Sequence, residues 1–197
     1  SSSEFWLVGG TATVNGITKS STGSTQTSEI RFEGGELRYG GSSANANFLP
    51  NLTGLTANVR AGGAIINSNG QDITIAHSLE HDASGPATDG GLTKRGNGTL
   101  TLTGNNTYNG TTTVEQGTLR VAHGGSIITS LTSIEAGGTL GGDGTVGWID
   151  LQTGGQIAPG NSIGTLTLSS EVFSPLDWYG EQNGSNHAQM LFELSMI

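Results

Sequence analysis

The sequence predicts an all-β protein, a parallel β-solenoid in a single elongated domain, and three observations lead to this prediction. Leu100 and Leu102 alternate with threonines, as in a strand with one buried face. Glycine and asparagine bracket such strands at close intervals, which is turn chemistry. The tripeptide Gly-Thr-Leu recurs at somewhat irregular steps, beginning at Gly98, Gly117, Gly138 and Gly164. Short strands that repeat at about one rung length are typical of a solenoid.

A second recurring pattern supports the same architecture. An apolar residue, a short stretch ending in glycine, one variable residue and another apolar residue recur at residues 32–37, 59–65, 114–119, 134–140 and 151–157. We interpret each copy as a strand, a sharp glycine corner and the next strand, because glycine reaches positive φ without a Cβ clash. Asn-Gly pairs provide further turn residues at 15–16, 69–70, 97–98 and 109–110.

Composition excludes two other classes of chain. Glycine accounts for 34 of 197 residues, and each glycine costs a helix about 1 kcal/mol relative to alanine, so long helices are not expected. Disorder is disfavoured because aliphatic residues keep regular strand positions. With rungs of roughly 20 residues, we expect nine or ten rungs and a rod on the order of 45 Å long. Aliphatic side chains should fill its interior, threonines should cover its outside, and both ends should be open.

The charge and residue composition limit the classes of partner that the chain could bind. The net charge is −9, and Lys94-Arg95 is the only pair of adjacent bases, so no nucleic acid partner is expected. There is no cysteine and therefore no disulfide framework. No apolar run approaches the roughly 18 residues of a membrane-spanning helix. The chain begins Ser1-Ser-Ser-Glu without a leader, so we expect any export signal to have been removed or left out.

The stretch from Gly98 to Val121 closely resembles the passenger-associated transport repeat of bacterial autotransporters. Residues 138–146 and 157–168 look like the segment that usually follows this repeat, and the resemblance is specific over residues 89–168. It implies a right-handed parallel β-helix exported to the outside of a bacterium or to its surface, where the repeat assists passenger folding or secretion. Family members are usually far longer than this chain.

The C-terminal part departs from the repeat, so we divide the chain into a solenoid at residues 1–170 and a divergent excursion or cap at residues 171–197. The excursion contains a candidate ligand or assembly surface formed by Asp177, Trp178, Tyr179 and Glu181. Paired carboxylates and aromatics there would suit a sugar, whereas the plainer interpretation is a cap on the rod. Residues 190–197 resemble a terminal strand.

Three short motifs suggest catalysis or metal binding, but their context favours structure. Ser162 lies in a Gly-x-Ser-x-Gly pattern without the helix that a nucleophile elbow requires. His77 and His81 match His-x-x-Glu-His, yet a preceding strand pattern favours turn histidines over a metal site. Residues 141–144 resemble a single calcium repeat but are better interpreted as a turn. Asp143 and Asp150 have no nearby Arg or Lys in the sequence, unlike the sites of pectin-degrading β-helices.

The leading hypothesis is a non-enzymatic, extracellular β-solenoid that acts as stalk or scaffold, with no cofactor and no metal, because titratable groups do not cluster in the sequence. The first alternative is an adhesin that binds surface glycans through its outer faces or the Trp178-Tyr179 loop. Another alternative is a fibre subunit that self-associates through open solenoid ends. A polysaccharide lyase or hydrolase ranks last.

Overall fold

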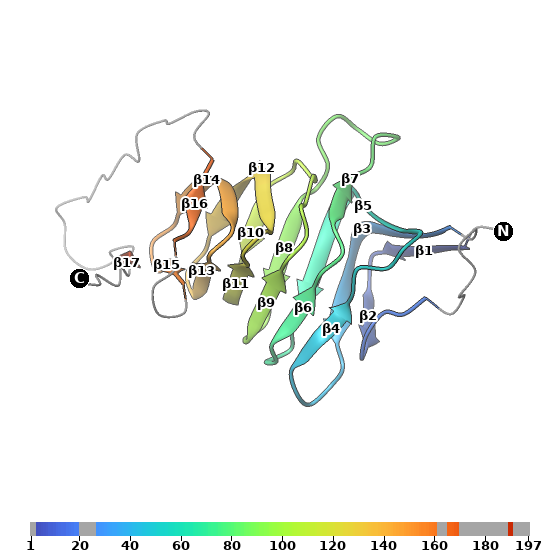
Figure 1. Cartoon of the computed structure of the whole chain (residues 1–197), viewed down its shortest axis with the longest axis horizontal. Helices are drawn as coiled ribbons and strands as arrows, with labels where there is room; N and C mark the ends of the chain where they lie inside the picture. Colours follow the sequence, from blue (N-terminus) through green and yellow to red (C-terminus); the bar gives the residue numbers. More distant parts are fainter. Residues whose placement is uncertain (1–2, 20–26, 161–164, 170–188, 191–197) are drawn as a thin grey trace.

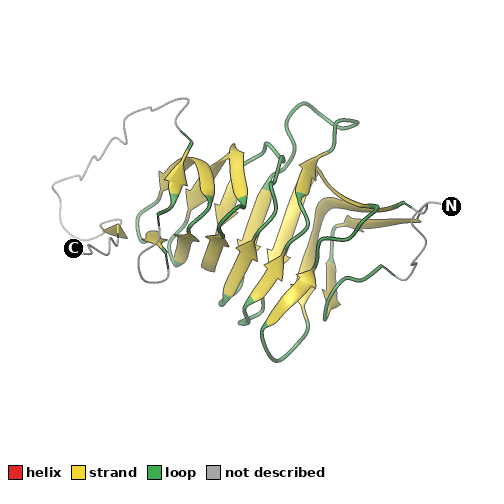
Figure 2. Cartoon of the chain, in the orientation of Figure 1, coloured by secondary structure: helices red, strands yellow, loops and turns green. Residues whose placement is uncertain are grey.

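The computed structural model describes residues 3–19, 27–160, 165–169 and 189–190, and within them the chain is all-β (Figure 2). The strands follow one another along a single long axis, with their colours in sequence order (Figure 1). The paired strands of the described residues run parallel to one another. Among the same residues, no helix is long and apolar enough to cross a membrane. The predicted parallel β-solenoid is therefore confirmed.

The strands form two hydrogen-bonded sheets. The larger sheet contains β1 (Ser3–Val8), β2 (Thr11–Val14), β3 (Ser28–Tyr39), β5 (Leu55–Asn67), β7 (Leu79–His81), β8 (Leu92–Arg95), β10 (Thr112–Val114), β12 (Ser126–Ile134), β14 (Thr145–Leu151) and β16 (Thr167–Leu168). The smaller sheet contains β4 (Asn45–Leu49), β6 (Ile73–Ile75), β9 (Thr99–Leu102), β11 (Gly117–Val121), β13 (Gly138–Gly142), β15 (Gln156–Pro159) and β17 (Gln189–Met190).

The larger sheet supplies two of the three faces of the solenoid. The first half of β3 pairs with β1 and with the first half of β5, which in turn pairs with β7. The second half of β3 pairs with β2 and with the second half of β5, which pairs with β8. We call these rows the first face and the second face, and the smaller sheet is the third face. Each rung therefore crosses three faces and turns three corners.

The length of a rung falls along the chain. Ser28 is in register with Leu55, whereas Thr139 is in register with Gln156, which is a much shorter step along the sequence. The predicted spacing is right for the repeat itself, because Gly117 lies beside Gly138. Among the described residues, the main path of the larger sheet holds eight strands, compared with the nine or ten rungs expected for the whole chain. With strands about 4.8 Å apart, that path is about 34 Å long.

The core is a set of columns in which equivalent residues of successive rungs stack. On the third face, Leu100 lies beside Leu119, and Leu119 lies beside Leu140, all fully buried. Outward positions carry threonines as predicted, although Thr112 and Thr132 are buried in an inner column of the second face. Because no rung covers its own apolar side, stability comes from the neighbouring rungs.

The five predicted glycine corners are confirmed by backbone geometry. Each copy of the pattern contains one glycine with a φ between 72° and 89°, namely Gly34, Gly63, Gly117, Gly137 and Gly154. In the last three copies, this glycine lies where the chain passes from the larger sheet to the smaller one, either between two strands (Gly137 and Gly154) or as the first residue of β11 (Gly117). In the first two copies it lies inside β3 and β5, where the chain passes from the first face to the second.

Candidate functional site: polar clamps at the corners of the repeat

Lys94 occupies an interior position that the surrounding rungs fill with aliphatic residues. On the second face it is in register with Ile66 of the preceding rung and Val114 of the following one, and its side chain is fully buried. Its ammonium donates to the carbonyl oxygens of Arg95 at 3.0 Å, Gly96 at 2.6 Å and Gln116 at 3.0 Å. Lys94 therefore fastens two successive rungs at the corner between the second and third faces.

Two opposing effects act on the protonation of Lys94. Burial disfavours the charged form and lowers the pKa of Lys94 to about 8, while the charge of Asp72 acts in the opposite direction. The three carbonyl acceptors also favour the ammonium, because a neutral amine has only two hydrogens to donate. The group is thus a cation at pH 7 that is held by main-chain dipoles and not by a contacting carboxylate.

Asp89 lies at the corner between the first and second faces. Its carboxylate is 1% exposed and accepts from the backbone N–H groups of Gly91, Asn109 and Gly110, each at 2.8–2.9 Å. Nδ1 of His81 lies 2.9 Å from Oδ2 of Asp89, the oxygen that also accepts from Asn109. Since Asn109 and Gly110 belong to the following rung, Asp89 also joins two rungs.

Asn106 occupies the third corner, between the third and first faces. Its side-chain oxygen accepts from the backbone N–H of Leu79 at 2.9 Å, in the rung before. Its amide nitrogen donates to the carbonyls of Gly104 at 2.9 Å and Ser126 at 3.0 Å, the latter in the rung after. The side chain is almost fully buried. We call Lys94, Asp89 and Asn106 the corner clamps.

A chain of hydroxyl groups reinforces the Asp89 corner. The hydroxyls of Tyr108 and Thr112 are 2.7 Å apart, as are those of Thr112 and Ser130. Ser130 donates to the carbonyl of Gly110 at 2.7 Å, so Thr112 must donate to Ser130, and Tyr108 to Thr112. Burial raises the pKa of Tyr108 and keeps the phenol protonated. This series of hydrogen bonds connects two rungs, and each of its three hydroxyl groups has a hydrogen-bond partner.

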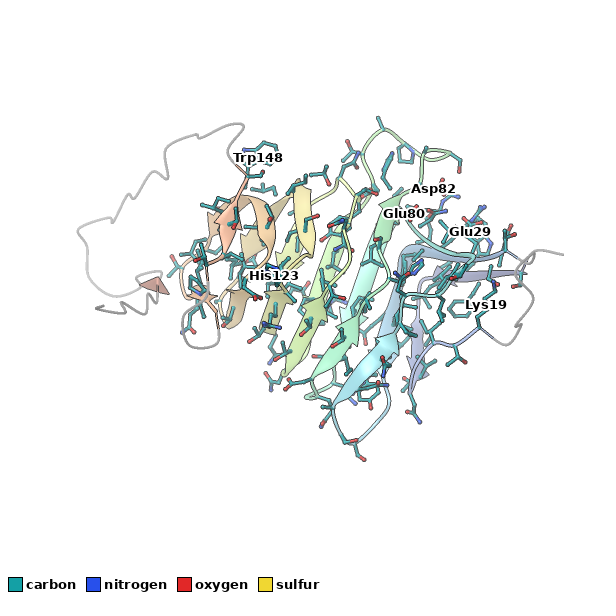
Figure 3. All side chains as sticks on the ribbon, in the orientation of Figure 1. Lys19, Glu29, Glu80, Asp82, His123 and Trp148 are labelled. Atoms are coloured by element: carbon teal, nitrogen blue, oxygen red, sulfur yellow. The ribbon has the colours of Figure 1, made fainter. Side chains whose placement is uncertain are left out.

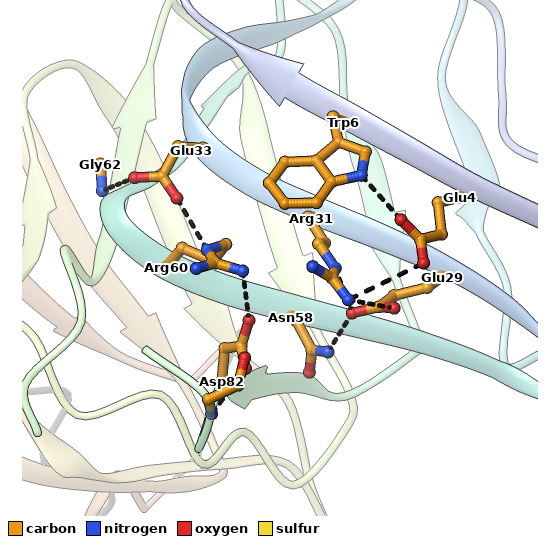
Figure 4. Close-up of polar contacts among 10 residues, drawn as sticks. Glu4, Trp6, Glu29, Arg31, Glu33, Asn58, Arg60, Gly62 and Asp82 are labelled. Atoms are coloured by element: carbon orange, nitrogen blue, oxygen red, sulfur yellow. Dashed lines mark hydrogen bonds and ion pairs between the residues drawn. The ribbon is translucent and has the colours of Figure 1, made fainter. Parts of the chain in front are cut away.

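A second polar cluster crosses the outside of the first face in the N-terminal half (Figure 4). We call it the outer ladder, and it consists of Glu4, Trp6, Glu29, Arg31, Glu33, Asn58, Arg60 and Asp82. Glu29, Glu80 and Asp82 lie on the same half of the molecule, whereas His123 and Trp148 lie on the other half (Figure 3).

The ladder contains two ion-pair centres. Arg31 donates to Glu29 at 2.6 Å and 2.9 Å, and this contact, with help from Asn58, lowers the pKa of Glu29. Arg60 contacts Glu33 at 2.9 Å and Asp82 at 3.0 Å. Hydrogen bonds from Ser84 are the main cause that lowers the pKa of Asp82, and Arg60 adds to it. Together these pairs connect β3, β5 and the loop after β7.

The surface proposed from the sequence, Asp177, Trp178, Tyr179 and Glu181, lies outside the described residues, and so does Ser162. His77 is buried, with its Nδ1 3.4 Å from the backbone nitrogen of Leu52, and His81 contacts Asp89. Within the described part of the chain, no group of three or more His, Cys, Asp or Glu is arranged to hold a metal ion.

One sequence-based expectation is wrong. Asp143 is not isolated from basic residues, because Arg120 of the preceding rung donates to it at 3.1 Å. The two residues are 23 positions apart and meet only because the coil returns at about that interval. Asp143 also accepts from the backbone N–H of His123 at 3.0 Å, so it closes a corner.

Sequence reasoning missed the corner clamps. The signal for Lys94 was present, because alternation from the buried Leu92 places Lys94 on the interior side of its strand. Asp89 and Asn106 gave no such signal, since both lie in segments whose pairing depends on the exact length of the rung. Trp6 was also missed, because β1 lies outside the stretch with the clearest repeat.

Comparison with known proteins agrees with this geometry. The model of the family described as the passenger-associated-transport-repeat matches residues 92–121, which include Lys94 and Asn106. An extracellular serine protease of Serratia marcescens is 40% identical over 147 residues, covering 74% of this chain and 14% of that protein. The adhesin BmaC autotransporter of Brucella suis is 37% identical over 123 residues, covering 62% of this chain and 3% of that protein.

This chain therefore spans a small fraction of the length of these curated relatives. No solved structure matches it. The fold and the corner clamps define the class as a repeat protein of the parallel β-solenoid type. The chain contains a passenger-associated transport repeat at residues 92–121.

Proposed function

We propose that this chain is a structural segment of an autotransporter-like passenger, exposed outside a bacterial cell or on its surface, in which the repeat is the most stable part of a stalk. The single observation that carries the proposal is the set of three corner clamps. Each corner of the repeat rung is held by a buried polar side chain bonded to the backbone of a neighbouring rung. Such bonds form only when successive rungs are in register, so they favour one coiled arrangement over slipped ones.

The comparisons support the extracellular assignment. Both relatives named above carry names that place them outside the cell or among autotransporters. The protease name belongs to a protein of which this chain resembles 14%, and we propose that the present chain is not an enzyme. The pairing of His81 with Asp89 does not argue otherwise, because the same carboxylate accepts from three backbone N–H groups at a corner of the solenoid.

The test is to follow urea unfolding of the purified chain and to assay the same samples for turnover of casein and of plant and bacterial polysaccharides. We expect the wild type to unfold cooperatively and to show no turnover. Asp89→Ala and Asn106→Ala should each lower the free energy of unfolding strongly. Polysaccharide turnover that Asp177→Ala or Glu181→Ala abolishes would overturn the non-enzymatic assignment. Clamp variants as stable as the wild type would overturn the structural role.

A second candidate function, self-association through an open end of the solenoid, is favoured by Phe5. This residue is in register with the buried Ile30, yet it is 47% exposed because no described strand lies beyond β1. A strand from another copy would extend the column over it. Sedimentation at rising concentration should then show assemblies that Phe5→Lys prevents, and a monomer at every concentration would eliminate this candidate.

The domain boundary and the C-terminal surface remain proposals. We keep residues 1–170 as the solenoid and residues 171–197 as a separate excursion, with Asp177, Trp178, Tyr179 and Glu181 as its ligand or assembly surface. Trp178→Ala should then weaken assembly or glycan binding without lowering the melting temperature of the solenoid. A lowered melting temperature with intact binding would assign the excursion to the fold instead.

A further inference from the structure

Trp6 lies on the outside of the first face. The guanidinium of Arg31 lies 4.5 Å from the ring centroid and that of Arg60 lies 5.2 Å away, so both cations are within the distance of a cation–π contact. The ring nitrogen donates to Glu4 at 2.9 Å, which fixes the rotation of the ring (Figure 4). Trp6 nevertheless remains 45% exposed.

The groups beneath the ring make its orientation rigid. Arg31 is held by Glu29 at 2.6 Å, and Arg60 is held between Glu33 and Asp82 at 2.9 Å and 3.0 Å. Each arginine is thus fixed before any ligand arrives. A ring that is already immobile loses little further freedom on binding, which is the condition for an aromatic contact that contributes affinity.

We propose that the open face of Trp6 binds a neutral hexopyranose unit of a glycan. The C–H groups of a pyranose ring form a flat apolar surface that stacks on an indole, while its hydroxyls need acceptors at the rim. Glu4 supplies such an acceptor, because its carboxylate is 45% exposed and lies beside the ring.

The charged groups around Trp6 determine which class of sugar can bind there. The outer ladder contains four carboxylates, from Glu4, Glu29, Glu33 and Asp82, and two guanidiniums, from Arg31 and Arg60. Both guanidiniums are engaged by these carboxylates, and the whole chain carries a net charge of −9. Uronic, sialic and sulfated glycans are repelled by this field, and a neutral sugar is not.

The test is isothermal titration and saturation-transfer NMR with cellotriose and triacetylchitotriose, alongside trigalacturonate as the anionic probe. The expected result is saturable binding of at least one neutral trisaccharide, with transfer to its axial ring protons and none to trigalacturonate. Trp6→Ala should weaken binding at least tenfold, whereas Trp148→Ala, which removes another half-exposed tryptophan at the opposite half, should not.

Folding of the variants is checked separately, because Trp6 also covers two arginines. Trp6→Phe keeps an aromatic ring and should retain part of the affinity. Absence of saturation with both neutral trisaccharides, or equal binding by Trp6→Ala and the wild type, overturns the inference. Neither result affects the structural role proposed above, which depends on the corner clamps and is read from unfolding.

Discussion

The ammonium of Lys94 lies 3.0 Å from the carbonyl oxygen of Gln116, which belongs to the next rung of the solenoid. A side chain on the interior side of one strand therefore binds the corner of the rung that follows it. This contact places a cation inside a column otherwise built from Ile66, Val114 and similar residues. Such an arrangement is tolerated because the main-chain carbonyls replace the water that the ammonium loses.

Lys94→Met should lower the free energy of unfolding by about 2–4 kcal/mol, because a thioether leaves buried carbonyl groups without a donor. Apolar replacement of a buried charge is sometimes harmless, but here the abandoned acceptors are backbone atoms that stay in place. Urea denaturation measures the change. The matched control is Arg95→Met, since Arg95 forms a half-exposed pair with Glu115 and should cost about 1 kcal/mol or less. Equal effects of the two substitutions would contradict the role of Lys94.

Alkaline pH should stabilise the wild type relative to Lys94→Met. The pKa of Lys94 is about 8 in the folded chain and 10.5 in the unfolded chain, so the unfolded state binds more protons between these values. The free energy of unfolding therefore rises as pH increases from 8 to 10.5, by about 1–3 kcal/mol, with the carbonyl contacts limiting the gain. Denaturation curves of both proteins at pH 7.5, 9 and 10.5 test this. A difference that stays constant over the series would disprove it.

Gly91→Ala should destabilise the chain by more than about 3 kcal/mol or prevent folding. Gly91 has a φ of 69°, and an added Cβ would collide with the backbone oxygen of Thr111 in the next rung. Gly124→Ala is the matched control, because its φ of 81° is similar but no atom lies within 4 Å of the added Cβ. That variant should lose only about 1 kcal/mol, from backbone conformation alone. Thermal unfolding of the pair separates close rung contact from backbone strain, and equal losses would show that rung contact adds nothing.

Asp82 should contribute to acid denaturation. Its pKa is lowered in the folded chain, so its stabilisation is complete above the ordinary aspartate value of 3.8 and is lost as pH falls through the lower folded value. Asp82→Asn should therefore lower stability at pH 7 and flatten the fall in stability between pH 5 and pH 2. Asp150→Asn, at an exposed position, serves as the control and should leave that profile unchanged. An unchanged acid profile in Asp82→Asn would show that the ionised carboxylate, with its contacts to Ser84 and Arg60, has no net effect on stability.

The fold was predictable because its main determinants are local. Alternation at Leu100 and Leu102 and the glycine corners such as Gly137 depend on neighbouring residues, and the structure confirms them. Contacts between rungs were much harder to foresee. The two residues of such a contact lie one rung apart in the sequence, and the number of residues in a rung varies along the chain. Arg120 and Asp143 illustrate the difficulty, since the step that brings them together is neither the longest nor the shortest in the coil.

The same reasoning explains the candidate sites. Lys94 could have been placed inside from alternation, but its acceptor in the next rung, the carbonyl of Gln116, depends on the length of the coil. Trp6 and Arg60 are distant in the sequence, and their stacking requires the chain to complete two turns of the coil between them. Sequence reasoning instead selected Trp178 and Tyr179 for their composition, and these residues lie outside the described part of the chain.

Native-state hydrogen exchange tests the central claim, that the repeat is the most stable part of the solenoid, most directly. The backbone N–H groups of Leu79, Gly91, Asn109 and Gly110, which donate to Asp89 or Asn106, should exchange only through global unfolding. In Lys94→Met, their protection should fall together with the global free energy of unfolding. Faster exchange at these four groups than in β3 or β5 of the wild type would contradict the account.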